Sequence, residues 1–142
     1  MGRLSIKTEN YRTPGFTPVG NVLAGQVVKL VTEDSISALD DVNAAFGVAT
    51  ETNVPFADPA KYYDDINRGG RIGTTHGGLI YVQDDGRGAA FDAANIPALR
   101  AVVYWDIAAK VYTSVATGNV RVGTCIKTAS GASDSLGIKL EI

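Results

Sequence analysis

The sequence predicts a mainly β fold: a small single-domain barrel or sandwich with one or two short helices and an extended N-terminal arm. Residues 101–142 contain four short segments of strand pattern, separated by turn-forming residues. In the last segment Leu136, Ile138, Leu140 and Ile142 alternate with small or charged residues, which is the period of a sheet with one buried face. Sixteen glycines and five prolines fit a chain of many tight turns.

The chain starts with the predicted arm, residues 1–20. Leu4 and Ile6 alternate with polar residues there, but the prolines and the glycine of residues 13–18 then force an extended or turning path. Residues 21–142 are expected to form one β-rich domain, because a chain of 142 residues is most simply a single domain. The first strand of that domain is expected at 26–32.

Two short helices are expected next. In residues 35–46, Ser37 can cap a helix whose apolar residues recur at helical spacing. Residues 58–66 begin with a capping aspartate and a first-turn proline, and two glycines follow at positions 69 and 70. Residues 46–50 return to a strand pattern.

The rest of the chain again has the pattern of strands. Residues 71–83 read as a strand interrupted by glycine, and residues 84–88 read as a turn. Residues 91–100 fit no single element, because Pro97 would break a helix. The last strands are expected at 101–106, 111–114, 120–127 and 136–142.

The formal net charge of -2 predicts no strong attraction to nucleic acid or to an anionic membrane. The charge is unevenly placed, however: residues 1–32 sum to +3, residues 33–65 to -7 and residues 66–142 to +2. A basic arm beside an acidic middle suggests that one docks on the other, in the same subunit or in a neighbour. A solvated acidic loop region explains the pattern equally well.

Cys125 is the one cysteine, which excludes an intrachain disulfide and a cysteine-clustered zinc site. It falls in a predicted strand, so we expect a buried, inert thiol. The first residues have no apolar core of secretory-signal length, and Ile6 stands where a myristoylation signal needs Ser or Thr. No apolar run approaches the ~20 residues of a spanning helix. We therefore expect a soluble chain that is made in the host cytoplasm without a signal peptide.

No motif for chemistry is found. His76 is the one histidine, and a histidine beside a glycine turn is usually a hydrogen-bonded structural residue. Adjacent aspartates occur three times, but none has the alternate spacing of a calcium loop. Residues 68–73 are glycine-rich without the Lys-Ser/Thr ending of a phosphate-binding loop. We expect no catalytic residue, no metal and no cofactor, and hence not an enzyme.

The aromatic residues have two interpretations. They can line a sugar-binding or protein-binding surface, or they can pack as core and cross-strand pairs. Their alternation along a predicted strand favours the core. The residues concerned are Tyr62, Tyr63, Tyr104, Trp105 and Tyr112.

Several segments together resemble the capsid cement (decoration) proteins of tailed bacteriophages. The shared features are a glycine before an early hydrophobic strand, a Gly-Val-Ala strand, a Val-Tyr-Trp-Asp hairpin, and a Gly-Thr step before a terminal strand. They fall at residues 20–30, 46–49, 102–106, 111–113, 120–124 and 137–140. The match covers residues 20–50 and 101–142, and residues 52–100 look like an elaboration of that core.

The resemblance implies a small β-rich domain of the β-tulip type that binds the outer surface of an assembled capsid and stabilises it against the pressure of packaged DNA. It implies the major capsid protein and further copies of the chain, commonly as trimers, as partners, and it brings no catalytic residues. In this interpretation the arm contacts a neighbour through Arg3, Lys7, Tyr11, Arg12 and Phe16. The alternative is a non-catalytic carbohydrate- or protein-binding β-domain of a virion tail or surface.

Overall fold

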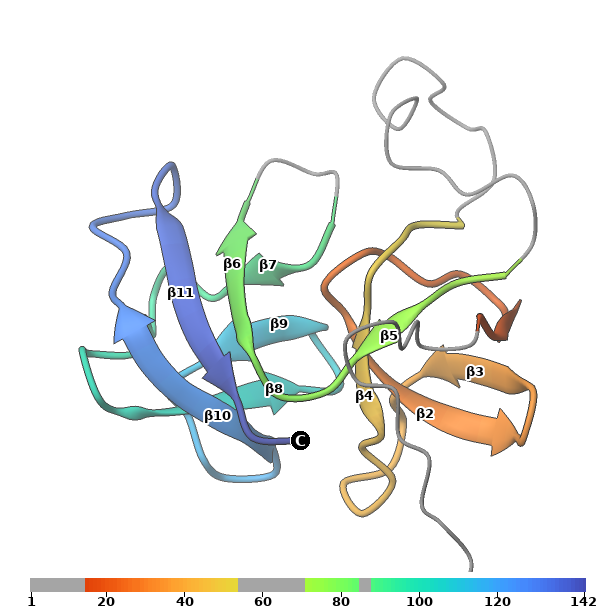
Figure 1. The fold of residues 1–142 in the computed structure, drawn as a ribbon. Coiled ribbons are helices and arrows are strands. Elements are labelled where there is room, and N and C mark those ends of the chain that lie inside the picture. The colour runs from red at the N-terminus through yellow and green to blue at the C-terminus, as the bar shows by residue number, and fades with distance from the viewer. Residues whose placement is uncertain (1–14, 54–70, 85–87) are drawn as a thin grey trace, which may run out of the picture.

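The structure is a computed structural model that describes residues 15–53, 71–84 and 88–142. These residues form eleven strands in two sheets, with no helix among them (Figure 1). The mainly β character predicted from the sequence is confirmed. In spatial order the N-terminal sheet contains β1 (Thr17–Val19), β3 (Ser35–Ala38), β2 (Val27–Thr32), β4 (Gly47–Ala49) and β5 (Thr74–Thr75).

The C-terminal sheet is curled into a half-barrel (Figure 1). Its spatial order is β6 (Leu79–Gln83), β11 (Ser135–Leu140), β10 (Val120–Lys127), β8 (Val102–Asp106), β9 (Val111–Thr113) and β7 (Ala90–Phe91). The last strand, β11, pairs antiparallel with β10 on one side and β6 on the other. All four strands predicted in residues 101–142 are present, as β8, β9, β10 and β11.

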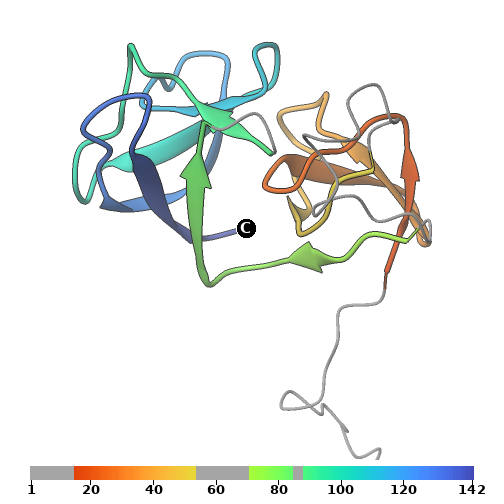
Figure 2. The ribbon, with the colours of Figure 1, turned by 90° about the horizontal axis from the view of Figure 1, so that it is seen from above.

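Within the described residues the chain passes from the N-terminal sheet to the C-terminal sheet between β5 and β6 (Figure 2). Gly77 and Gly78 occupy this crossing with φ angles of 65° and 75°. That region of backbone space is open to glycine at little cost and strained for most other residues. The glycines that interrupt the predicted strand thus turn the chain from one sheet into the next.

Buried side chains join the two sheets. The main core contains Val27, Leu39 and Val48 from the N-terminal half together with Trp105 and Tyr112 of the C-terminal sheet. A second cluster lies on the other face of the N-terminal sheet and consists of Phe16, Val22, Val28, Ile36, Ala49 and Ile72. Since successive side chains of a strand point to opposite faces, Val27 and Val28 serve different clusters. The N-terminal sheet is thus buried on both faces near its centre.

The predicted helix at 35–46 is wrong. Residues 35–38 form β3, which pairs with β2 on one side and with β1 on the other. Ile36 is fully buried in the second cluster. Two ladders of backbone hydrogen bonds and a buried side chain outweigh a local capping pattern whose helix would satisfy only its own backbone. The other predicted helix, at 58–66, lies outside the described residues.

The end of the predicted arm belongs to the N-terminal sheet. Thr17–Val19 form β1, and Phe16 pairs with Ile72 through two backbone hydrogen bonds of 2.8 and 2.7 Å. Arg71 Nε donates a hydrogen bond of 2.8 Å to the carbonyl of Gly15. Residues 1–14 of the arm lie outside the described residues. The chain is thus fixed to the sheet from Gly15 onward.

Candidate functional site

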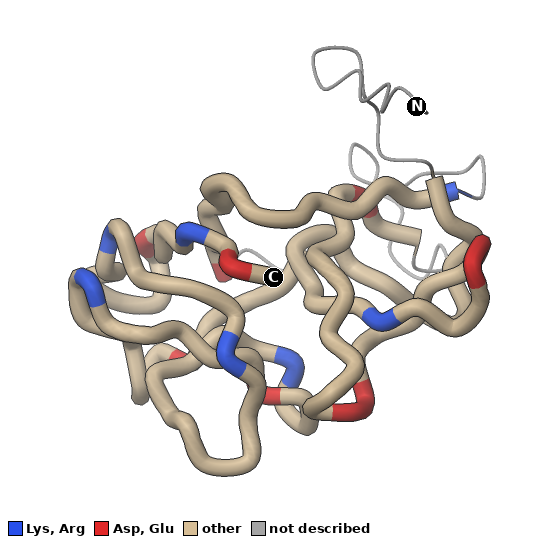
Figure 3. Tube along the Cα trace, turned by 60° about the horizontal axis from the view of Figure 1, so that its bottom comes forward, with Lys and Arg blue, Asp and Glu red and all other residues tan. Residues whose placement is uncertain are grey.

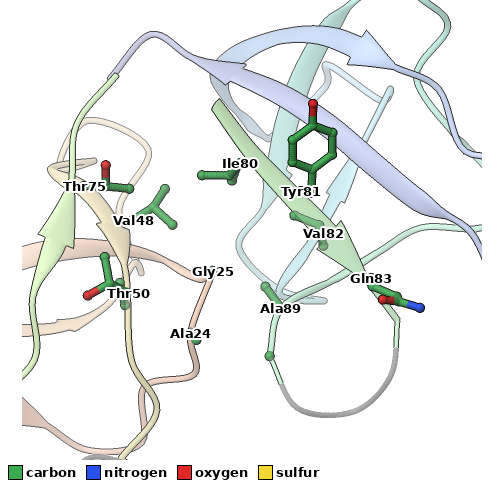
Figure 4. A pocket seen from close by; sticks show the side chains of 12 residues that line it. Ala24, Gly25, Val48, Thr50, Thr75, Ile80, Tyr81, Val82, Gln83 and Ala89 are labelled. Carbon is green, nitrogen blue, oxygen red and sulfur yellow. The ribbon is translucent and has the colours of Figure 1, made fainter. Parts of the chain in front are cut away.

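A pocket of about 550 Å³ lies between the two sheets (Figure 4). One wall comes from β4, β5 and the turn before β2, and the other wall comes from β6 and the segment before β7. Ile80 of β6 and Val48 of β4 point toward each other across it (Figure 4). Its lining consists of Ala24, Gly25, Val48, Ala49, Thr50, Thr75, Ile80, Tyr81, Val82, Gln83, Gly88 and Ala89.

Two backbone segments that line the pocket also contact each other between the sheets. We call this contact, with the tyrosine that bonds to it, the sheet junction: Ala24, Gly25, Gly88, Ala89 and Tyr112. Ala89 N–H donates to the Ala24 carbonyl at 2.8 Å, and the Tyr112 hydroxyl donates to the Gly25 carbonyl at 2.5 Å. A side chain at Gly88 would lie 2.6 Å from the Ala24 oxygen, so only glycine allows this approach. Small residues thus let two backbone segments meet directly.

The pocket offers apolar contact and shape. None of its lining residues is acidic, basic, histidine or cysteine; its polar groups are the Thr50 and Thr75 hydroxyls, the Gln83 amide and the backbone. Pockets of this volume hold small molecules or the side chains of a bound chain. Among the described lining residues no acid–base pair is present.

His76 lies on the crossing between the sheets and is exposed. Its Nε2 is 3.0 Å from the Thr74 hydroxyl, and its ring packs edge-on against Phe46 with the centroids 4.6 Å apart. A side chain at Gly47 would collide with the His76 ring, with 2.6 Å to Cε1. The ring therefore covers the Gly47 backbone and the Phe46 edge, which is the hydrogen-bonded structural role that the sequence indicates.

Cys125 is buried, as predicted. Its Sγ donates a weak hydrogen bond of 3.6 Å to the Pro97 carbonyl. Burial raises the pKa of the Cys125 thiol, which lowers the fraction of reactive thiolate at neutral pH. The residue behaves as a small core side chain.

The aromatic residues of the C-terminal sheet also belong to the core. Trp105 is 1% exposed and Tyr112 is fully buried, and their rings meet edge-on with the centroids 4.7 Å apart. This burial is the correction to the stacking-surface interpretation, because neither ring can reach a ligand at the surface. Tyr104 is half-buried, and Tyr62 and Tyr63 lie outside the described residues.

Of the five arm residues predicted to contact a neighbouring subunit, Phe16 alone lies within the described residues. Phe16 is 7% exposed and packs edge-on against Phe46, with the ring centroids 5.6 Å apart. Arg3, Lys7, Tyr11 and Arg12 lie outside the described residues.

Charged residues are spread along the chain in both halves of the protein (Figure 3). Within the described ranges no group of His, Cys, Asp or Glu has the arrangement of a metal site. Four ion pairs join described residues: Lys29–Asp40 at 2.7 Å, Arg71–Asp34 at 3.5 Å, Arg121–Glu141 at 3.1 Å and Lys127–Asp134 at 3.0 Å.

Asp134 closes the loop between β10 and β11. Its carboxylate accepts hydrogen bonds from Ser130 N–H at 3.0 Å, Lys127 Nζ at 3.0 Å and Ser135 N–H at 2.8 Å. These bonds, first of all the one from Ser130, hold the pKa of the Asp134 carboxyl well below its ordinary value of 3.8. The ionised form is therefore the one that the folded loop stabilises.

We expect Asp134→Asn to lower the melting temperature at pH 7. We also expect the melting temperature of this variant to decrease less than that of the wild type as the pH is lowered. A carboxyl whose pKa is lowered by folding contributes stability above its unfolded pKa, and that contribution is lost as the pH falls below it. The melting temperatures of the two proteins should thus differ most at neutral pH and approach each other below pH 3.8. A constant difference from pH 7 to pH 3 would contradict this assignment.

No protein-family model matches the chain, and no curated protein matches it. In the part of the chain that the structure describes, no helix is long and apolar enough to cross a membrane. The fold and the site together define a two-sheet β protein with an uncharged pocket at the junction of its sheets. Sequence reasoning did not find this pocket, because its lining comes from five separate short segments that carry no motif.

Proposed function

We propose that this chain is a structural virion protein, a decoration protein that binds the outer surface of an assembled phage capsid. The proposal rests on a resemblance in sequence: several segments of this chain resemble the cement proteins of tailed bacteriophages and occur in the same order. Those segments coincide with β2, β4, β8, β9, β10 and β11, and so with the framework of both sheets. In this role the chain is not an enzyme and needs no cofactor.

The physical mechanism is linkage between binding and assembly. A protein that binds only the assembled, expanded lattice stabilises that lattice by RT ln(1 + [L]/Kd) per site. A trimer that contacts several capsid subunits gains further affinity, since its second and third contacts form at a high effective concentration. The partners are thus the major capsid protein and further copies of this chain, and the load that they resist is the pressure of packaged DNA.

In this proposal the N-terminal arm contacts a neighbouring subunit. Arg3, Lys7 and Arg12 make residues 1–14 basic, whereas residues 33–65 are strongly acidic. Attraction between these regions in neighbouring subunits would steer and strengthen the contact and would weaken with added salt. Phe16 is excluded from the contact surface, because it packs inside the second cluster.

Deleting residues 2–14 tests the role of the arm without removing Phe16 from the core. We expect the shortened chain to bind expanded, undecorated capsids at least about tenfold more weakly, a loss of about 1.4 kcal/mol. A full-length chain with Arg3, Lys7 and Arg12 replaced by Gln separates charge from length, and its affinity should depend less on salt. Unchanged affinity of the shortened chain, with unchanged melting temperature, would refute the role of the arm.

A further inference from the structure

Strand β6 is an unprotected sheet edge. A sheet edge exposes backbone groups that can pair with another chain, and proteins usually blunt such edges with proline, charge or shortness. Three of the four edges in the described sheets have such protection: β1 contains Pro18, and β5 and β7 have two residues each. Strand β6 has five residues, Leu-Ile-Tyr-Val-Gln, with no proline, glycine or charge. Among the described edges, β6 is therefore the one best suited to pair with a strand of another chain.

The register shows which backbone groups are free. Leu140 N–H donates to the Gly78 carbonyl at 2.8 Å, and antiparallel pairs alternate between bonded and non-bonded. Ile80 and Val82 therefore bond to β11, through Ile138 and Leu136. The intervening Leu79, Tyr81 and Gln83 direct their N–H and C=O groups to the open side, where no described strand pairs with them.

The open side of β6 faces the pocket (Figure 4). The other lining residues belong to the N-terminal sheet, with Val48 and Thr75, and to the segment before β7, with Gly88 and Ala89. The Tyr81 ring points away from the pocket and lies over Gly137 on the outer face, where it leaves the edge uncovered (Figure 4). The groove thus offers both backbone partners and an apolar, uncharged wall.

We propose that this groove binds residues 3–8 of a second copy of the chain as an added strand. The segment Arg-Leu-Ser-Ile-Lys-Thr alternates apolar and polar residues and contains no proline or acidic residue. In an antiparallel register that sets Ile6 opposite Ile80, Leu4 lies opposite Val82. Both apolar side chains then share the face of β6 that lines the pocket.

The length of the chain agrees with this occupant. The same register sets Arg3 opposite Gln83, at the end of β6, with its side chain on the face away from the pocket. Residues 9–14 remain as a spacer before Gly15, which Arg71 fixes to the N-terminal sheet. Fully extended, this spacer spans about 20 Å, enough to leave one copy and reach the next.

The contact differs from a two-fold interface, because the donated segment and the accepting groove are different surfaces. Such a head-to-tail interface closes into a ring when the rotation between copies allows it. A ring of three is the state that the proposed function expects. The strand exchange itself needs only a second copy, so it can be tested without capsids and independently of the proposed function.

Amide hydrogen exchange in the full-length chain tests the proposal. We expect the Leu79, Tyr81 and Gln83 amides to be protected at high protein concentration and to lose that protection on dilution. Ile6→Asp should reduce the protection about tenfold or more, since it places a charge against the apolar wall. Ser5→Asp is the matched control: it adds the same charge on the opposite face and should leave the protection largely unchanged.

A second pair of variants changes the acceptor. Tyr81→Pro removes an N–H that faces the open side, while the β11 ladder keeps its bonds through Ile80 and Val82. It should abolish self-association in sedimentation velocity, and Tyr81→Ala, which keeps the N–H, should retain it. Free exchange of the three amides at every concentration would overturn the proposal, as would protection that survives Ile6→Asp. Protection that does not change on dilution would identify the chain's own segment as the occupant and overturn the exchange between copies.

Discussion

Replacing Gly123 with alanine is expected to destabilise the protein by at least about 3 kcal/mol or to prevent folding. Gly123 lies in β10 at a shift of register opposite β8, where two residues of β10 face one of the partner strand. A Cβ at this position would lie 2.0 Å from the Lys139 carbonyl oxygen and 2.9 Å from its carbon. Both are backbone atoms of β11, so no rotamer change relieves the collision, and the central pairing must separate.

Denaturant unfolding followed by Trp105 fluorescence measures this effect, because Trp105 is the one tryptophan and is buried in the main core. Gly131→Ala is the matched control, since a Cβ there meets nothing within 4 Å. It should change the unfolding free energy by less than about 0.5 kcal/mol. A Gly123→Ala protein with the wild-type midpoint would show that β10 and β11 do not approach each other as described.

The sequence predicts correctly those strands that are determined by local patterns. It fails where an element is determined by pairing with residues far away in the chain. Residues 136–140 alternate because one face is buried, and the alternation is visible in the sequence alone. Residues 35–38 carry the cap and spacing of a helix, but their backbone partners lie in β1 and β2. Pairing decided elsewhere in the chain thus overrode a local signal.

The pocket and the register shift at Gly123 could not be predicted from the sequence, because both depend on residues far apart in the chain. The sheet junction brings Ala24 and Gly25 against Ala89 and Tyr112, and no local pattern links residues so far apart. One signal was present in the sequence: Leu79–Gln83 is a strand without charge, proline or glycine. Sequence reasoning placed a strand there, but only the sheet order makes it an edge.

Replacing Tyr112 with phenylalanine is expected to cost about 1–3 kcal/mol, although it removes a single oxygen. The Tyr112 hydroxyl is fully buried and donates its hydrogen bond to the Gly25 carbonyl across the sheet junction. Burial also raises the pKa of the Tyr112 phenol, so the group remains a donor over the whole range of pH in which the protein is handled. Without it, the carbonyl of the half-buried Gly25 loses its protein partner.

Tyr104→Phe is the matched control, because Tyr104 is a half-buried tyrosine of the neighbouring strand β8 and its change should stay within about 0.5 kcal/mol. The loss at Tyr112 should also appear locally, as faster exchange of the Ala89 amide, which bonds to Ala24 beside it. Equal unfolding midpoints for the two phenylalanine variants would mean that the hydroxyl does not hold the sheets together. A lower midpoint with a faster Ala89 amide in Tyr112→Phe alone would locate the weakened contact at the sheet junction, whose backbone lines the pocket beside β6.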